Sequence, residues 1–144
     1  MADLAELYQQ LIIEHNRSPR NFRTLPDANR SAEGDNPLCG DRINLQLKLE
    51  DGVIKDIGFQ GSGCAISRAS ASLMTAAVQG RTAAEAGKLF DAFHGMVTGH
   101  PDAPVDTAGL GKLAALAGVR RFPGRVKCAT MAWHTLQDAI GAKG

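Results

Sequence analysis

Hydrophobic patterning in the first half of the chain predicts one helix followed by a two-stranded hairpin. Over residues 4–15, apolar residues recur at three- and four-residue steps, which is typical of an amphipathic helix. Residues 17–37 are polar and rich in Pro and Asn, so we expect a long connection there with room for one weak edge strand. Over residues 42–59 the period is two, and the pair Asp51-Gly52 is a strong turn signal. The alternation on both sides of this turn predicts two antiparallel strands.

The second half of the chain reads as helical. Small residues fill 65–79, which predicts a helix that packs closely, and Thr82 begins a capping-box pattern for the next one. A short helix capped by Asp106 or Thr107 should follow, and a last helix should run over about 128–140. Together these elements predict the α+β class, with a small antiparallel sheet and helices packed on one face of it.

Composition narrows the class of protein further. A chain of 144 residues has the usual size of one domain, so we expect a single domain over residues 1–144. The formal net charge of +1 gives no sign of a nucleic-acid partner. No apolar run is long enough to cross a bilayer, and the acidic N-terminus does not resemble a signal peptide. We therefore expect a cytoplasmic protein with reduced thiols and no membrane partner.

The three cysteines are the candidate chemistry. Cys39 lies just before the hairpin and Cys64 just after it, and antiparallel pairing brings these outer ends together. Cys64 and Cys128 each open a predicted helix, where partial positive charge favours the thiolate. Asp41 adds a carboxylate close to Cys39. Three thiolates and one carboxylate form a plausible four-ligand metal site.

Ligand chemistry restricts the metal but does not prove that there is one. Sulfur ligands with one oxygen suit zinc or an iron-sulfur unit, whereas magnesium and calcium prefer oxygen. Such a cluster carries net negative charge, and Lys127, Arg125 and Arg68 are the candidate cations beside it. The cysteine spacing matches no common zinc finger. Inert core thiols, or a nucleophilic cysteine without metal, therefore remain open on the residues alone.

Three blocks of the sequence, one around each cysteine, carry a resemblance to a known family. The blocks are Asn36-Pro37-Leu38-Cys39-Gly40-Asp41-Arg42, Gly61-Ser62-Gly63-Cys64-Ala65-Ile66-Ser67 and Arg125-Val126-Lys127-Cys128-Ala129-Thr130-Met131-Ala132-Trp133. In their order and spacing they resemble the IscU/NifU N-terminal superfamily, and specifically its SufU branch. The resemblance extends over nearly the whole chain and implies the IscU/SufU-like fold.

Two departures from the IscU pattern point to the SufU branch. IscU-type scaffolds have His immediately before the third cysteine, where this chain has Lys127, and this chain has extra sequence around residues 95–119. The resemblance then implies a zinc-dependent sulfurtransferase that takes persulfide sulfur from a SufS-type cysteine desulfurase. It passes the sulfur on to a downstream iron-sulfur scaffold. The implied zinc ligands are Cys39, Asp41, Cys64 and Cys128.

The roles of individual residues follow as hypotheses. Cys39 is the expected mobile, sulfur-accepting thiolate because it lies on a Pro/Gly turn, while the other two cysteines begin helices. Asp41 would be a ligand that also adjusts the charge of the site, with Lys127 and Arg125 as its electrostatic partners. An iron-sulfur scaffold that binds a cluster in place of zinc is the main alternative. A non-enzymatic interaction module in which zinc only supports folding is the third interpretation.

Several other residues invite a functional interpretation that we do not adopt. The four histidines are expected on helix sides and loops rather than as metal ligands. Trp133 is expected in the core. The histidines are His15, His94, His100 and His134.

Overall fold

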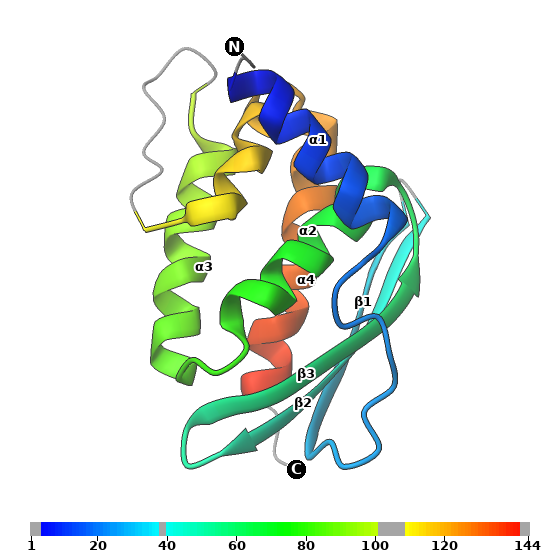
Figure 1. The fold of residues 1–144 in the computed structure, drawn as a ribbon, viewed down its shortest axis with the longest axis vertical. Coiled ribbons are helices and arrows are strands. Elements are labelled where there is room, and N and C mark those ends of the chain that lie inside the picture. The colour runs from blue at the N-terminus through cyan, green and yellow to red at the C-terminus, as the bar shows by residue number, and fades with distance from the viewer. Residues whose placement is uncertain (1–3, 38–39, 101–108, 142–144) are drawn as a thin grey trace.

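The computed structural model describes residues 4–37, 40–100 and 109–141. It contains a three-stranded antiparallel sheet in the order β1-β2-β3, and Figure 1 shows the helices gathered on one side of that sheet. This arrangement confirms the predicted α+β class. The strands are β1 (Arg30–Asn36), β2 (Asp41–Glu50) and β3 (Val53–Ser62).

The predicted hairpin is β2 and β3. Its turn residues Asp51 and Gly52 have φ values of 53° and 76°, the left-handed geometry that a tight two-residue hairpin requires. On β2 the alternate residues Ile43, Leu45 and Leu47 are buried against the helices. The same alternation, continued to the start of the strand, turns the side chain of residue 41 towards the helical layer.

The weak edge strand is present as β1. It pairs with β2 in an antiparallel register that places Asn36 directly opposite Asp41. The connection that precedes β1 follows the sheet at its other edge, where Arg23 N–H donates to Phe59 O at 3.0 Å and Phe59 N–H donates to Asn21 O at 2.9 Å. The polar segment after the first helix is therefore fixed to the sheet by backbone hydrogen bonds.

The helical layer follows the predicted order, with one element of a different type. The capping box that begins α3 is confirmed, with Thr82 and Glu85 exchanging side-chain and backbone hydrogen bonds. The short helix is a 3₁₀ helix that continues to Arg121, and its predicted caps, Asp106 and Thr107, lie outside the described residues. The elements are α1 (Leu4–Arg17), α2 (Ala65–Val78), α3 (Ala83–Thr98), the 3₁₀ helix η1 (Gly111–Arg121) and α4 (Pro123–Gly141).

The predicted start of the last helix is wrong. α4 begins at Pro123, so Cys128 lies in its second turn rather than at its start. Proline suits the first helical position because its ring fixes φ near the helical value and its missing N–H would have no intrahelical partner there. The first turn is solvent-exposed, so no apolar periodicity reveals it. The macrodipole effect expected at Cys128 is correspondingly weaker.

The sheet and helices share one hydrophobic core. Trp133 on α4 is fully buried, as predicted, and its ring stacks on Phe93 of α3 with centroids 4.8 Å apart. Among the described residues, no helix has the length and apolar character needed to span a membrane. This core supports α4 and thereby the position of Cys128.

Candidate metal centre

Asp41 places a carboxylate in the protein interior at the first residue of β2. Its side chain is fully buried, on the same face of the strand as Ile43 and Leu45. Oδ1 accepts the backbone N–H of Cys64 at 2.8 Å. In the part of the chain that the structure describes, no Lys or Arg forms an ion pair with this carboxylate. A buried carboxylate whose hydrogen-bond donors both come from Cys64, with no cation paired to it, is costly unless a positive ion is bound next to it.

Gly63 makes the contact between Asp41 and Cys64 possible. Its φ is 154°, and a Cβ atom at this position would lie only 2.3 Å from Oδ1 of Asp41. Only glycine therefore lets the chain turn from β3 into α2 against the carboxylate. Gly63 is thus a geometric requirement of the site.

Cys64 is the N-cap residue of α2. Its extended backbone (φ −73°, ψ 167°) aims Sγ back at the first turn, where Ser67 N–H donates to it at 3.4 Å. The same sulfur lies 3.9 Å from Oδ2 of Asp41, and the side chain is partly exposed. The sulfur of Cys64 thus receives a backbone N–H donor and lies at the positive end of the α2 dipole.

Cys128 comes from the opposite side of the cluster and is fully buried on α4. Asn36, at the end of β1, directs Nδ2 at its sulfur at 3.6 Å. The adjoining carbonyl of Ala129 accepts a hydrogen bond from Ser70 Oγ at 2.5 Å, which ties α4 to α2 beside the site. Cys128 is therefore held by contacts with both the sheet and a neighbouring helix.

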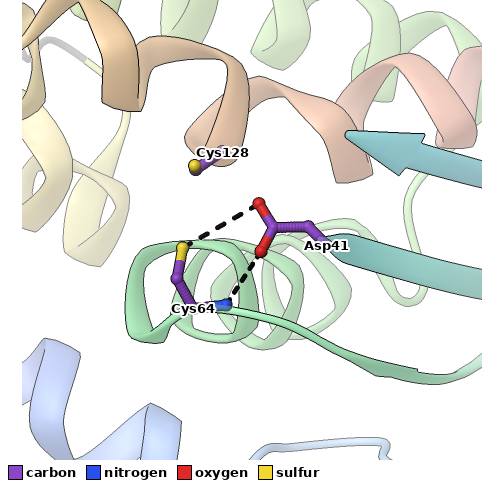
Figure 2. A group of neighbouring side chains, drawn as sticks. All are labelled: Asp41, Cys64 and Cys128. Carbon is purple, nitrogen blue, oxygen red and sulfur yellow. Dashed lines mark hydrogen bonds between the residues drawn. The ribbon is translucent and has the colours of Figure 1, made fainter. Parts of the chain in front are cut away.

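The three groups meet in one place. Ligand atoms of Asp41, Cys64 and Cys128 all lie within 4.8 Å of one another, and Figure 2 shows the carboxylate and the two sulfurs facing a common space. Soft sulfur donors with one oxygen are the set that zinc or an iron-sulfur unit takes. The donor chemistry, the burial and the uncompensated carboxylate all fit a bound cation.

Of the other predicted site residues, the structure describes Lys127 and Arg125. Cys39, the predicted fourth ligand and mobile thiolate, lies outside the described residues, as does Leu38. Lys127 and Arg125, the predicted electrostatic partners, have exposed side chains on the first turns of α4. Both residues lie within three positions of Cys128 in the sequence.

Asn36 is a site residue that the sequence analysis missed. It is nearly fully buried and contacts Cys128, 92 positions further along the chain. The signal in the sequence that could have identified Asn36 as a site residue was its place at the start of the block that contains Cys39 and Asp41. The strand pairing that turns Asn36 inward could not be read from a segment without apolar alternation.

The histidines differ from the expectation in one case. His15 is buried, with Nδ1 2.7 Å from Ser72 Oγ, which in turn accepts the backbone N–H of Arg20 at 2.7 Å. Burial lowers the pKa of His15 below its ordinary value of 6.5, and the nearby Arg20 guanidinium lowers it further. His94 and His134 are exposed and in ring contact, with centroids 6.0 Å apart. None of these histidines lies in the cysteine cluster.

The fold and the cluster define a small α+β protein in which two cysteines and a carboxylate converge. The model of the family described as the NifU-like N terminal domain matches residues 7–129. The chain belongs to this family, which confirms the family predicted from the three sequence blocks.

Individual relatives agree with this assignment. The chain is 41% identical to the "Zinc-dependent sulfurtransferase SufU" of Bacillus subtilis, over 96% of this chain and 92% of that protein. It is also 41% identical to the "Iron-sulfur cluster assembly scaffold protein IscU" of Streptococcus pyogenes, over 97% of this chain and 86% of that protein. A crystal structure of the SUF-system protein FiSufU from Fervidobacterium islandicum AW-1 has a TM-score of 0.85 at 30% identity, covering 96% and 99% of the two chains.

Proposed function

We propose that this chain is a zinc-dependent sulfur acceptor that works with a SufS-type cysteine desulfurase in iron-sulfur cluster assembly. One observation carries the proposal: Asp41, Cys64 and Cys128 converge within 4.8 Å in a chain 41% identical to the B. subtilis sulfurtransferase. The reaction needs reduced thiols, which is why we place the protein in the cytoplasm. The acquired sulfur would pass to a downstream iron-sulfur scaffold.

The proposed metal ligands are Cys39, Asp41, Cys64 and Cys128. The last three supply two sulfurs and an oxygen from one cluster, and Cys39 belongs to the same short block as Asp41. When bound, Zn²⁺ keeps its sulfur ligands deprotonated at neutral pH. Lys127 and Arg125 offset the negative charge of the ligand set from the protein surface.

Cys39 is the proposed acceptor of sulfur. Its thiolate attacks the outer sulfur of the persulfide on the desulfurase cysteine. A new S–S bond forms to Cys39 as the S–S bond of the donor breaks, and the bonding electron pair leaves with the desulfurase thiolate. The proton of the persulfide stays on the transferred sulfur, so the step needs no added oxidant or reductant.

Cys64 and Cys128 are less suited to this role. Each receives an N–H donor on its sulfur, and each is fixed within a packed helix or at its cap. Asp41 is buried and hydrogen-bonded to the chain at Cys64, so it acts as a fixed ligand that adds negative charge.

Persulfide mapping tests the assignment of the acceptor. The protein would be incubated anaerobically with a SufS-type desulfurase and cysteine, and the modified cysteine identified by mass spectrometry in wild type and in the Cys39→Ser, Cys64→Ser and Cys128→Ser variants. We expect the added sulfur on Cys39, and its loss only in Cys39→Ser among variants that circular dichroism shows to be folded. Persulfide lost in folded Cys64→Ser and retained in Cys39→Ser would overturn the assignment.

An iron-sulfur scaffold is the second candidate, favoured by the equal identity to the S. pyogenes protein of that name. The two functions differ in the final metal content. Zinc, iron and acid-labile sulfide per chain would be measured after an anaerobic reaction with desulfurase, cysteine and ferrous iron. Retained zinc with stimulated desulfurase turnover supports sulfur transfer. Replacement of zinc by iron and bound sulfide would identify a scaffold instead.

A further inference from the structure

Asn36 directs an amide donor at one sulfur of the cluster. Its Nδ2 lies 3.6 Å from Sγ of Cys128, and both side chains are buried, with Asn36 6% exposed. The position of Asn36 is fixed by strand pairing, because it lies opposite Asp41 where β1 and β2 meet the site. Asn36, which carries the donor, is thus paired directly with Asp41 of the cluster.

A donor at this distance changes the chemistry of a thiolate. Hydrogen bonds to ionised groups are roughly twice as strong as neutral ones. They withdraw electron density from the sulfur, so a hydrogen-bonded thiolate is a weaker nucleophile and a more firmly oriented ligand. Asparagine supplies this donor without a charge, whereas aspartate at the same position would place a second carboxylate against the sulfur.

The two described cysteines obtain their donors in different ways. Cys64 receives a backbone N–H from Ser67, which any residue at that position except proline would supply. Cys128 receives a side-chain N–H from Asn36, and this donor depends on which residue occupies position 36. Position 36 is therefore a place where substitution changes the reactivity of one sulfur and leaves the protein backbone intact.

We propose that Asn36 is a positioning residue that keeps Cys128 a permanent, weakly nucleophilic ligand. It thereby directs persulfide transfer to another cysteine of the set. The proposal rests on the proposed function and specifies which sulfur the site protects. In this role Asn36 acts through Cys128 and does not itself contact the transferred sulfur.

Alkylation of the zinc-loaded protein tests the protection directly. Iodoacetamide would be added to wild type, Asn36→Ala and Asn36→Asp, and the modification of each cysteine followed by peptide mass spectrometry. In wild type, Cys128 should react slowest. Removal of the donor should raise its rate by about tenfold, because the sulfur loses a charge-assisted hydrogen bond that lowers its nucleophilicity. Asn36→Asp is close in shape and serves if the alanine variant does not fold.

Asn44→Ala is the matched control. Asn44 lies on β2, on the exposed face of the same sheet, and has no place in the cluster. This variant should leave the alkylation rate of Cys128 unchanged. A Cys128 rate that rises equally in Asn44→Ala would mean that general loosening of the sheet, rather than the lost donor, exposes the sulfur, and would refute the proposal.

Cobalt substitution provides a readout independent of access to the sulfur. In Co²⁺-loaded protein the sulfur-to-metal charge-transfer band should move to longer wavelength in Asn36→Ala, because the sulfur electrons are no longer stabilised by the amide. An unchanged band with an unchanged Cys128 rate would refute the role of Asn36.

A wild-type protein that binds neither Zn²⁺ nor Co²⁺ would instead refute the proposed function. In that case the Cys128 rates of the metal-free proteins decide the role of Asn36: a faster reaction in Asn36→Ala supports protection by the amide, and equal rates refute it.

Discussion

Replacing Gly63 by alanine should damage the site by pushing Asp41 away from Cys64. The new methyl group would lie 2.3 Å from Oδ1 and 3.0 Å from Cα of Asp41, so the carboxylate or the turn has to move. The hydrogen bond from Cys64 N–H to this carboxylate is of the charged type, worth about 1.5–3 kcal/mol. The backbone conformation at φ 154° adds about 1–3 kcal/mol of strain for a residue with a side chain.

We therefore expect Gly63→Ala to lower the free energy of unfolding by about 3 kcal/mol, since local relaxation recovers part of the combined cost. Urea unfolding followed by circular dichroism, in the presence of a chelator, measures this effect without any contribution from bound metal. Zinc content per chain, measured separately, should also fall, because Asp41 no longer faces the two sulfurs.

Gly95→Ala provides the control for a glycine-to-alanine change. Gly95 lies within α3, and a Cβ atom there has no atom within 4 Å, so this substitution should stabilise the protein by about 0.5–1 kcal/mol. Its zinc content should equal that of wild type. Wild-type stability and wild-type zinc content in Gly63→Ala would show that the close approach to Asp41 has no role in forming the site.

Three further predictions concern the burial of single groups. Because the pKa of His15 is lowered in the folded protein, the unfolded chain binds more protons, and the free energy of unfolding should be highest above about pH 6.5 and fall as the pH drops through that value. Urea unfolding at a series of pH values measures this fall. His15→Asn should abolish it, and His94→Asn, at an exposed position, should retain it. Asp41→Asn keeps an oxygen that can accept the Cys64 N–H but loses the negative charge, so the variant should fold and release zinc to a competing chelator faster than wild type. Equal rates of zinc release would argue against Asp41 as a ligand. Trp133→Ala empties a fully buried site and should cost about 3–5 kcal/mol in urea unfolding, and a smaller loss would show that α3 and α4 can close the cavity.

Local patterns allowed the hairpin and half of the cluster to be predicted. The period-two alternation and Asp51-Gly52 fix the pairing of β2 with β3, and that pairing alone brings Asp41 near Cys64. The proximity of Cys128 depends instead on how α4 packs across the sheet. Packing of distant elements leaves no periodic signal, so the sequence suggested it only through ligand chemistry and family resemblance.

Two features that differ from the prediction, the start of α4 and the burial of His15, had weak signals in the sequence. Pro123 marks the first residue of α4, yet the exposed first turn hides the helix from any search for apolar periodicity. His15 follows Leu11 and Ile12 at the spacing of one helical face, which places it towards the core despite its polarity. By contrast, β1 has almost no apolar residues, so neither its register nor the inward position of Asn36 was predictable.

The contributing segments of the cluster are far apart in the order of synthesis. Asp41 and Cys64 emerge from the ribosome with the hairpin, whereas Cys128 follows 64 residues after Cys64. A nascent chain that has made the hairpin can offer an ion only part of the ligand set. In the proposed metal site, binding of the ion by the whole ligand set therefore requires α4 to have docked, so a fully loaded site would mark a chain that has completed its fold.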